Sequence, residues 1–221
     1  RDGGLVLQAG FIVGFDNDDP RIFDEQYEFI EESGVGQAMV SILTPIPTTP
    51  LYDRLKAEGR LNYTDPEVAF VPKLMTQAEL RTGHADLIRR LYEAPVFFGR
   101  VFKGYRSATF RARRQALDRA AGMTGFRSTV TRNFGALLVV LRLARELTRK
   151  SAFWRLFPQY VRLYVDENLA MRGERMPFYQ FVSLCLMHWH FYNIARRPHK
   201  GNVGITGEVE LSPSRATVPS H

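Results

Sequence analysis

Four consecutive polar residues, Asp16 to Asp19, follow directly after an apolar run and precede Pro20. Such side chains at the carboxyl end of a strand can bind a substrate or cofactor, because the active sites of parallel-strand barrels lie at that end. The same residues suit an ordinary helix start, since Asp is a common cap and Pro is favoured in the first turn. The sequence leaves both interpretations open.

Two glycines, Gly10 and Gly14, stand in the apolar run. Glycine in a buried strand allows a ligand or another backbone to come close. It can equally relieve packing beneath a helix, and a pattern this short does not separate the two explanations.

The histidines and the cysteine form no metal motif. His188 and His190 flank Trp189, and residues two apart on a helix point to different faces, so they cannot chelate one ion as an i, i+4 pair does. We expect a structural role for both, with their polar tips at a helix surface. Cys185 is the single cysteine, which excludes a disulfide framework and a multi-cysteine metal site within the chain. We expect Cys185 to be a small core residue.

Charge changes sign along the chain. Residues 1–80 carry 6 basic and 14 acidic residues, whereas residues 81–150 carry 16 basic and 4 acidic, within a formal net charge of +7. Such asymmetry suggests two regions with different roles. The densest basic stretch is interleaved with aromatic residues and comprises Arg100, Lys103, Arg106, Arg111, Arg113 and Arg114. Its composition suits solvated basic faces over an aromatic core, an anionic membrane surface, or docking onto an acidic region of the same protein; nucleic acid is the least favoured partner.

Residues 5–43 have the pattern of one strand–helix–strand unit. The segments 5–15 and 37–43 are apolar with little alternation, which predicts parallel strands buried on both faces. Two parallel strands cannot form a domain alone, and the chain has no initiator methionine. We therefore expect the neighbouring strands to lie in a missing N-terminal part of the same protein.

Helices are predicted for most of the remainder. Three prolines exclude regular structure from residues 44–50, and a short helix follows at 51–58. Thr76 and Glu79 have the spacing of a capping box. Further helices are expected at residues 77–93, 95–118, 128–150, 152–171 and 177–195. The Gly-, Ser- and Pro-rich residues 198–221 predict a disordered tail.

Two segments, GFIVGFDND (residues 10–18) and MVSILTPIPTTPLYDRLKAEGRL (residues 39–61), resemble the late barrel strands of radical S-adenosylmethionine enzymes, above all those with an upstream cobalamin-binding domain. LIRRLYEAPVFFGRV (residues 87–101) resembles a C-terminal extension of this subgroup, DUF4070. In that family a strand with the pattern G-x-I-x-G-x-x-E passes near the adenine of the cofactor. Gly10, Ile12 and Gly14 match the pattern, but Asn17 stands where the family has Glu. The resemblance, with the neighbouring Asp16, gives these five residues as the candidate cofactor-binding set.

The resemblance also implies cofactors. The family binds a [4Fe–4S] cluster through a Cys-x3-Cys-x2-Cys loop, and S-adenosylmethionine on its open iron yields a 5′-deoxyadenosyl radical. One cysteine cannot hold that cluster, so we expect this polypeptide alone to be inactive. Cobalamin is a further cofactor that the subgroup implies.

These observations predict an α/β region followed by an all-α region. Residues 1–75 would be the last strands of a partial (β/α) barrel, residues 76–197 a helical domain and residues 198–221 a tail. The expected activity of the parent protein is C-methylation of an unactivated carbon in a small molecule or lipid, in the cytoplasm or at the inner membrane face. The alternative is a non-catalytic helical module that binds a membrane or a protein through its basic face.

Overall fold

The computed structural model describes residues 7–65, 67–106, 108–122, 126–147, 151–170 and 176–196. It begins with strand β1 (Gln8–Val13), helix α1 (Ile22–Ser33) and strand β2 (Gln37–Ile42), and the two strands pair in parallel. Gly34 ends α1 in the left-handed conformation, at φ 66°, which glycine adopts without strain. The predicted strand–helix–strand unit is therefore confirmed.

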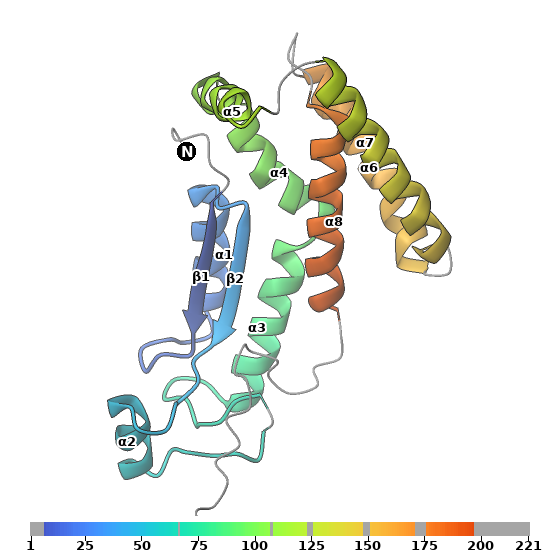
Figure 1. The fold of residues 1–221 in the computed structure, drawn as a ribbon. Helices are drawn as coiled ribbons and strands as arrows, with labels where there is room; N and C mark the ends of the chain where they lie inside the picture. The colour runs from blue at the N-terminus through green and yellow to red at the C-terminus, as the bar shows by residue number, and fades with distance from the viewer. Residues whose placement is uncertain are drawn as a thin grey trace, which may run out of the picture.

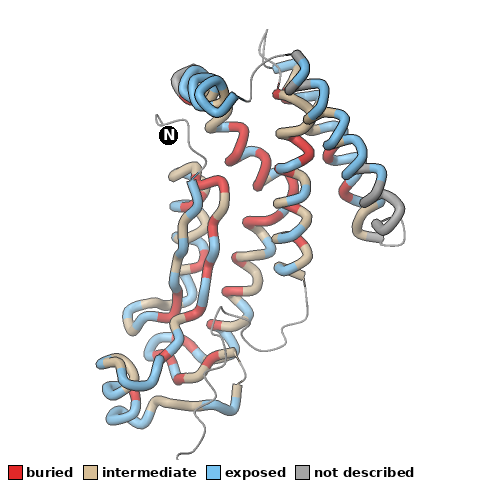
Figure 2. The backbone as a smooth tube through the Cα atoms, viewed as in Figure 1, coloured by how far each residue is buried: buried red, intermediate tan, exposed pale blue. Residues whose placement is uncertain are grey.

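One face of this sheet is covered and the other is not. Ala38, Val40 and Ile42 of β2 point to the covered face and are buried, together with Val13 of β1. On the opposite face Ile12 is 50% exposed and Met39 is 42% exposed. The expectation that both faces are buried is therefore wrong for the part of the chain that the structure describes, because the buried side chains of α1 and α3 join the core cluster of the covered face. Figure 2 shows buried and exposed residues alternating along β2.

Two caps identified in the structure fix the helices that follow the sheet. Helix α2 (Pro50–Ala57) starts at Thr49, whose hydroxyl accepts a hydrogen bond from the Tyr52 amide at 3.3 Å. Helix α3 (Gln77–Leu91) starts with the predicted capping box, in which Thr76 and Glu79 each bond the other's backbone amide. Figure 1 shows α3 running alongside β2 and leading toward the helical region.

In the described part of the helical region there are five further helices. They are α4 (Ala94–Tyr105), α5 (Ala108–Ala120), α6 (Phe126–Leu147), α7 (Ser151–Ala170) and α8 (Phe178–Ile194). The single helix expected at 95–118 is in fact two, since α4 ends at Tyr105 and α5 begins at Ala108. Gly104 weakens the helix there, and the Arg106 side chain is held by Glu167 of α7. The tail expected at 198–221 lies outside the described residues.

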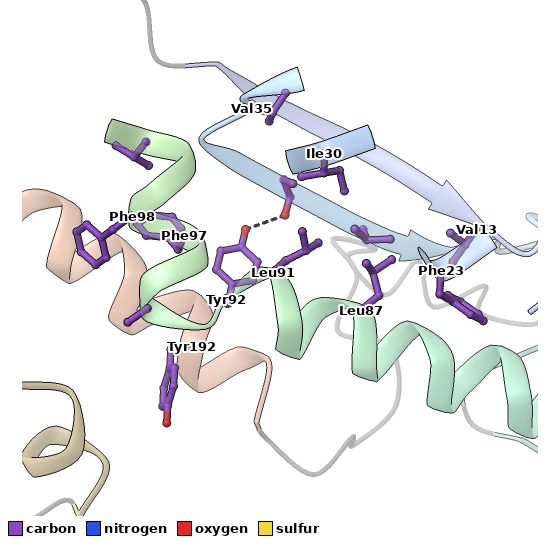
Figure 3. Packing of buried hydrophobic residues seen from close by; sticks show 14 of the residues in the cluster. Val13, Phe23, Ile30, Val35, Leu87, Leu91, Tyr92, Phe97, Phe98 and Tyr192 are labelled. Atoms are coloured by element: carbon purple, nitrogen blue, oxygen red, sulfur yellow. Dashed lines mark hydrogen bonds between the residues drawn. The ribbon is translucent and has the colours of Figure 1, made fainter. Parts of the chain in front are cut away.

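The core is continuous from the sheet to α8 and is rich in aromatic side chains. Figure 3 shows Leu87, Leu91 and Tyr92 facing β2, with Phe97 and Phe98 beyond them. The Tyr92 ring stacks on Phe191 of α8, with centroids 4.8 Å apart. Aromatic packing therefore joins the strand–helix–strand unit to the helical region.

Candidate functional site

The turn after β1 is closed by Asp18. Its Oδ2 accepts hydrogen bonds from the backbone amides of Gly14 at 2.8 Å and Phe15 at 2.9 Å. Asp19 accepts from the Arg21 amide at 2.8 Å and pairs with the Arg21 guanidinium. These two members of the polar cluster thus organise the backbone of the turn between β1 and α1. Neither caps α1, because the helix begins at Ile22 after Arg21 with no side-chain cap hydrogen bond and Pro20 lies before its first turn, so the expected Asp cap is wrong.

Asp16 has a different environment, formed by three basic side chains from later in the chain. It pairs with Arg54 of α2, with Nη1 of Arg60 at 2.8 Å, and with Nζ of Lys73 at 3.4 Å. Burial acts to raise the pKa of Asp16, but the hydrogen bonds and charges of Arg54 and Arg60 outweigh it and hold the pKa at about 2. Asp16 is therefore an ionised anchor for the segment that follows β2.

The two glycines of β1 differ in their surroundings. Gly14 has a φ of +102°, and a Cβ added there would lie 3.0 Å from Cδ2 of Leu80 and 3.4 Å from Cζ of Phe70. Its backbone conformation and its packing both call for glycine. A Cβ added to Gly10 would meet nothing within 4 Å. Gly14 thus allows Leu80 and Phe70 to pack closely against the end of β1. No contact in the described chain requires a glycine at position 10.

The candidate residues therefore occupy two places. Gly10 and Ile12 lie on the uncovered face of the sheet, beside Met39 and Ser41 of β2. Gly14, Asp16 and Asn17 lie beyond, at the carboxyl end of β1, where Asn17 is exposed. The structure brings them together along one strand and its exit. It does not test their role toward a cofactor.

The outer edges of the two strands also differ. The amides of Gln37 and Leu43 donate to the carbonyls of Leu7, just before β1, and Val13, at its end. The odd-numbered residues of β2 therefore direct their backbone groups toward β1. The carbonyls of Ala38 and Val40 consequently point away from β1. Tyr92 Oη donates to the Ala38 carbonyl at 2.7 Å (Figure 3), and Nε2 of His84 lies 3.0 Å from the Val40 carbonyl. Side chains of α3 and its end therefore cap the outer edge of β2.

No such cap exists for β1 among the residues that the structure describes. The even-numbered residues of β1, including Gly10 and Ile12, direct their N–H and C=O groups away from β2. The described sheet contains these two strands alone, so that edge has no strand partner within it. An uncapped edge is a template for another strand.

The basic stretch is less exposed than its sequence suggests. Arg100 is 2% exposed, pairs with Glu31 of α1 and donates to the Leu91 carbonyl at 2.9 Å. Arg106 forms a two-point contact with Glu167, at 3.1 and 2.7 Å. Arg114 lies 3.6 Å from Asp118. Arg100 and Arg106 therefore join helices in the structure, and the exposed members of the basic stretch are Lys103, Arg106 and Arg113.

The histidine pair is divided between core and surface. His190 is exposed, as expected, but His188 is fully buried among Phe97, Phe98 and Tyr192, so the expectation of a surface position is wrong for His188. Sequence spacing missed this residue because α8 is apolar nearly all round. Its burial follows from the aromatic residues that surround it in space.

The residues present do not fit an iron–sulfur cluster. Within the described ranges no group of three or more His, Cys, Asp or Glu side chains could hold a metal ion. Burial raises the pKa of the Cys185 thiol, which favours the protonated form over the thiolate that iron requires. No described helix is long and apolar enough to cross a membrane.

Several named bacterial proteins are similar to this chain over part of its length. Hopanoid C-2 methylase of Rhodopseudomonas palustris (strain TIE-1) is 32% identical over 90 residues, which cover 41% of this chain and 17% of that protein. Bacteriochlorophyllide d C-12(1)-methyltransferase of Chlorobaculum tepidum is 29% identical over 101 residues, covering 44% and 22%. Anaerobic magnesium-protoporphyrin IX monomethyl ester cyclase of Cereibacter sphaeroides is 29% identical over 110 residues, covering 47% and 18%. The chain thus spans about a fifth of the length of these curated relatives.

No solved structure matches the chain. The resemblance to the C-terminal portions of cobalamin-binding radical S-adenosylmethionine proteins is confirmed. Residues 49–202 match the family described as a domain of unknown function (DUF4070), and the chain belongs to that family.

Proposed function

We propose that this chain supplies the last two strands and the helical extension of a cobalamin-dependent radical S-adenosylmethionine enzyme that methylates an unactivated carbon of a small molecule or lipid. Two of the three relatives are named for methylation at a carbon position, and the third is named as a cyclase. Methyl transfer is therefore the activity that the names favour.

The observation that carries the proposal is the asymmetry of the sheet edges. The outer edge of β2 is capped by Tyr92 and His84, so the sheet ends there. The outer edge of β1, along Gly10 and Ile12, has no strand partner in the described sheet. This is the arrangement expected of the terminal strand pair of a larger parallel sheet, in which the preceding strand pairs with β1.

The uncovered face supports a position for the cofactor. In a partial barrel one face of each strand packs on helices and the other faces the lumen. Ala38, Val40 and Ile42 lie on the covered side, so Gly10, Ile12, Met39 and Ser41 would face the lumen. The open space above Gly10 fits a flat group such as the adenosyl moiety of S-adenosylmethionine lying against the strand.

The ligands of the cofactors and the surface beside S-adenosylmethionine would then come from different parts of the protein. The cluster and cobalamin supply the radical and methyl chemistry when bound, and their ligands would come from outside this chain. What this chain would contribute is a wall: Gly10 leaves room, Ile12 provides apolar contact, and Asp16 fixes the exit of the strand through Arg54 and Arg60.

The first test is the reading frame upstream of the Arg1 codon. We expect it to encode Cys-x3-Cys-x2-Cys. We also expect the whole protein, reconstituted with iron and sulfide and supplied with a one-electron reductant, to release 5′-deoxyadenosine from S-adenosylmethionine. A frame without that motif would refute the enzyme and leave the non-catalytic helical module. The 221-residue chain alone, treated identically, should release none.

A variant tests the wall itself. Gly10→Leu in the whole protein should weaken S-adenosylmethionine binding at least about tenfold, because the side chain would occupy the space proposed for the cofactor. Gly99→Leu is the matched control, since Gly99 is exposed on α4 and a Cβ there also meets nothing within 4 Å. Equal affinity in the two variants would remove Gly10 from the site.

A further inference from the structure

The apolar cover over the sheet is thinner above β1 than above β2. The residues of β2 that point to the covered face are all buried, and they are Ala38, Val40 and Ile42. On β1 the corresponding residues Ala9 and Phe11 are only half-buried, although both pack against the core. The described cover is therefore incomplete on the side where the edge of the sheet is uncapped.

Phe29 of α1 lies at this thin part of the cover. Its ring meets the ring of Phe11 on β1 edge to face, with centroids 6.1 Å apart and an interplanar angle of 76°. Phe29 is nevertheless 57% exposed. One side of this ring packs on the strand, and the rest of it is open to a further side chain that packs beside β1.

On the flank of α1 that faces α3, carboxylates and an aromatic ring already receive arginines. Nη1 of Arg90 on α3 lies 2.6 Å from Oδ1 of Asp24, and the guanidinium carbon of Arg90 lies 4.2 Å from the centre of the Tyr27 ring. Glu31 pairs with Arg100 of α4. Neighbouring helices thus pack on this flank through arginine, beside carboxylates and over an aromatic ring.

The flank on the side of β1 carries the same kinds of side chain. Glu25, Glu28 and Glu32 are exposed together with Phe29, and their spacings of three and four residues place them on one face of α1. We call these four residues the acidic flank. Carboxylates at this spacing repel one another, so a basic neighbour would stabilise them.

The parallel pairing of the strands determines which element can cover the acidic flank. A strand that precedes β1 and pairs in parallel with its outer edge needs a crossover connection to β1. Such crossovers are right-handed, so the connection lies on the same face of the sheet as α1. Figure 1 shows α3 on the side of β2, so the connection would lie beside α1 on the other side, which is where Phe29 contacts Phe11.

We propose that the acidic flank binds a basic amphipathic helix, which in the whole protein is the helix directly before β1. An apolar side chain of that helix packs on Phe29, and its Arg or Lys side chains pair with Glu25 and Glu28, as Arg90 pairs with Asp24 on the flank toward α3. The inference rests on the proposed function only in requiring a strand before β1, and it does not depend on the cluster or on methyl transfer.

Site-specific photo-cross-linking tests the contact in the whole protein. Phe29 is replaced by the photoreactive analogue benzoylphenylalanine, and the cross-linked peptides are identified by mass spectrometry. We expect position 29 to be joined to the segment directly before β1, and that segment to carry Arg or Lys at helical spacing. Trp154 on α7, which has the same 57% exposure, is the matched control position and should give no cross-link to that segment.

Charge reversal tests how the helix is recognised. The double variant Glu25→Lys/Glu28→Lys should lower the yield of the position-29 cross-link at least about threefold, because like charges would then face one another. Reversing the facing Arg or Lys residues to Glu in the same protein should restore the yield. Asp166→Lys, at an exposed position of α7, is the control and should leave the yield unchanged.

Three results would overturn the contact. They are a cross-link from position 29 to a second copy of the protein, a folded protein without a cross-link to the segment before β1, and a yield that the double variant leaves unchanged. The enzymatic proposal fails separately. A reading frame that encodes the strand and the basic helix without Cys-x3-Cys-x2-Cys would refute the enzyme and support the contact, whereas a frame without a preceding strand would overturn both.

Discussion

The Tyr160 hydroxyl lies 2.6 Å from Nδ1 of His188, inside the aromatic core between α7 and α8. Nε2 of the same imidazole lies 3.1 Å from the Tyr92 carbonyl, which can only accept, so the proton of the neutral ring belongs on Nε2. Nδ1 then accepts from Tyr160. Because Tyr92 also donates its own hydroxyl to Ala38, this series of hydrogen bonds links β2, the end of α3, α8 and α7.

Tyr160→Phe should destabilise the chain by about 1–3 kcal/mol, because it leaves Nδ1 of a fully buried histidine without a donor. Urea unfolding followed by circular dichroism measures the change. Tyr164→Phe is the control: Tyr164 is half-buried on the same helix, and its hydroxyl makes only a long contact of 3.4 Å to the Met176 carbonyl. A loss in Tyr164→Phe as large as that in Tyr160→Phe would contradict the role given to the Tyr160 hydrogen bond.

Stability should fall in mild acid because of His188. Burial lowers the pKa of His188 to about 4, the hydrogen bond to Tyr92 opposes this, and Arg196 and Arg100 lower it further. The unfolded chain, with a histidine pKa near 6.5, binds the proton first. The free energy of unfolding therefore decreases as pH falls from about 6.5 to about 4, by on the order of 3 kcal/mol at most.

His188→Gln separates this effect from other acid-sensitive groups. The variant lacks the titrating ring, so its unfolding free energy should vary less between pH 6.5 and 4.5 than that of the unmodified chain. His190→Gln, at an exposed position of the same helix, should retain the full dependence. Parallel pH profiles for all three proteins would show that His188 is not the responsible group.

Gly83 allows α1 and α3 to approach closely. A Cβ at this position would lie 2.1 Å from Cε2 of Phe23, which is buried. Gly83→Ala should therefore destabilise the chain by about 1–3 kcal/mol despite the better helix propensity of alanine. Gly99→Ala has no such neighbour and should stabilise by about 0.5–1 kcal/mol. Thermal unfolding of the two variants should shift in opposite directions, and a shift in the same direction would contradict the contact.

Local patterns predicted most of the elements. The apolar runs around Gly10 and Val40 predicted the two strands, and the spacing of Thr76 and Glu79 predicted the correct start of α3. The break after Tyr105 was not predicted; in the structure Arg106, next to that break, donates to Glu167, which is 61 residues away in the sequence. The helical spacing of apolar residues alone predicts one continuous helix across such a break.

The candidate site was predictable as a place and not as a set of contacts. The glycines and acidic residues marked the end of β1, but Asp16 finds its partners Arg54 and Arg60 only after 38 and 44 residues. The cap on the β2 edge joins Ala38 to Tyr92 across 54 residues. Periodicity reports which residues share a face of one element, whereas these pairs depend on how elements meet.

The carboxylate of Asp16 holds Arg54 and Arg60 beside the end of β1. The pKa of Asp16 is lowered to about 2, so the stabilisation is complete above the unfolded pKa of about 3.9 and is lost as pH falls toward 2. Asp16→Asn should lower the free energy of unfolding by about 1–2 kcal/mol at pH 7, a value reduced because Asp16 is partly exposed. The difference from the unmodified chain should shrink between pH 5 and pH 3.

Asp53→Asn is the control, since Asp53 is exposed in the first turn of α2 and should change stability by less than about 1 kcal/mol. Urea unfolding at both pH values measures these effects. If the whole protein binds S-adenosylmethionine as proposed, unchanged affinity in Asp16→Asn would assign Asp16 to the anchoring of α2 alone, whereas a loss of affinity beyond the change in stability would make it part of the cofactor wall.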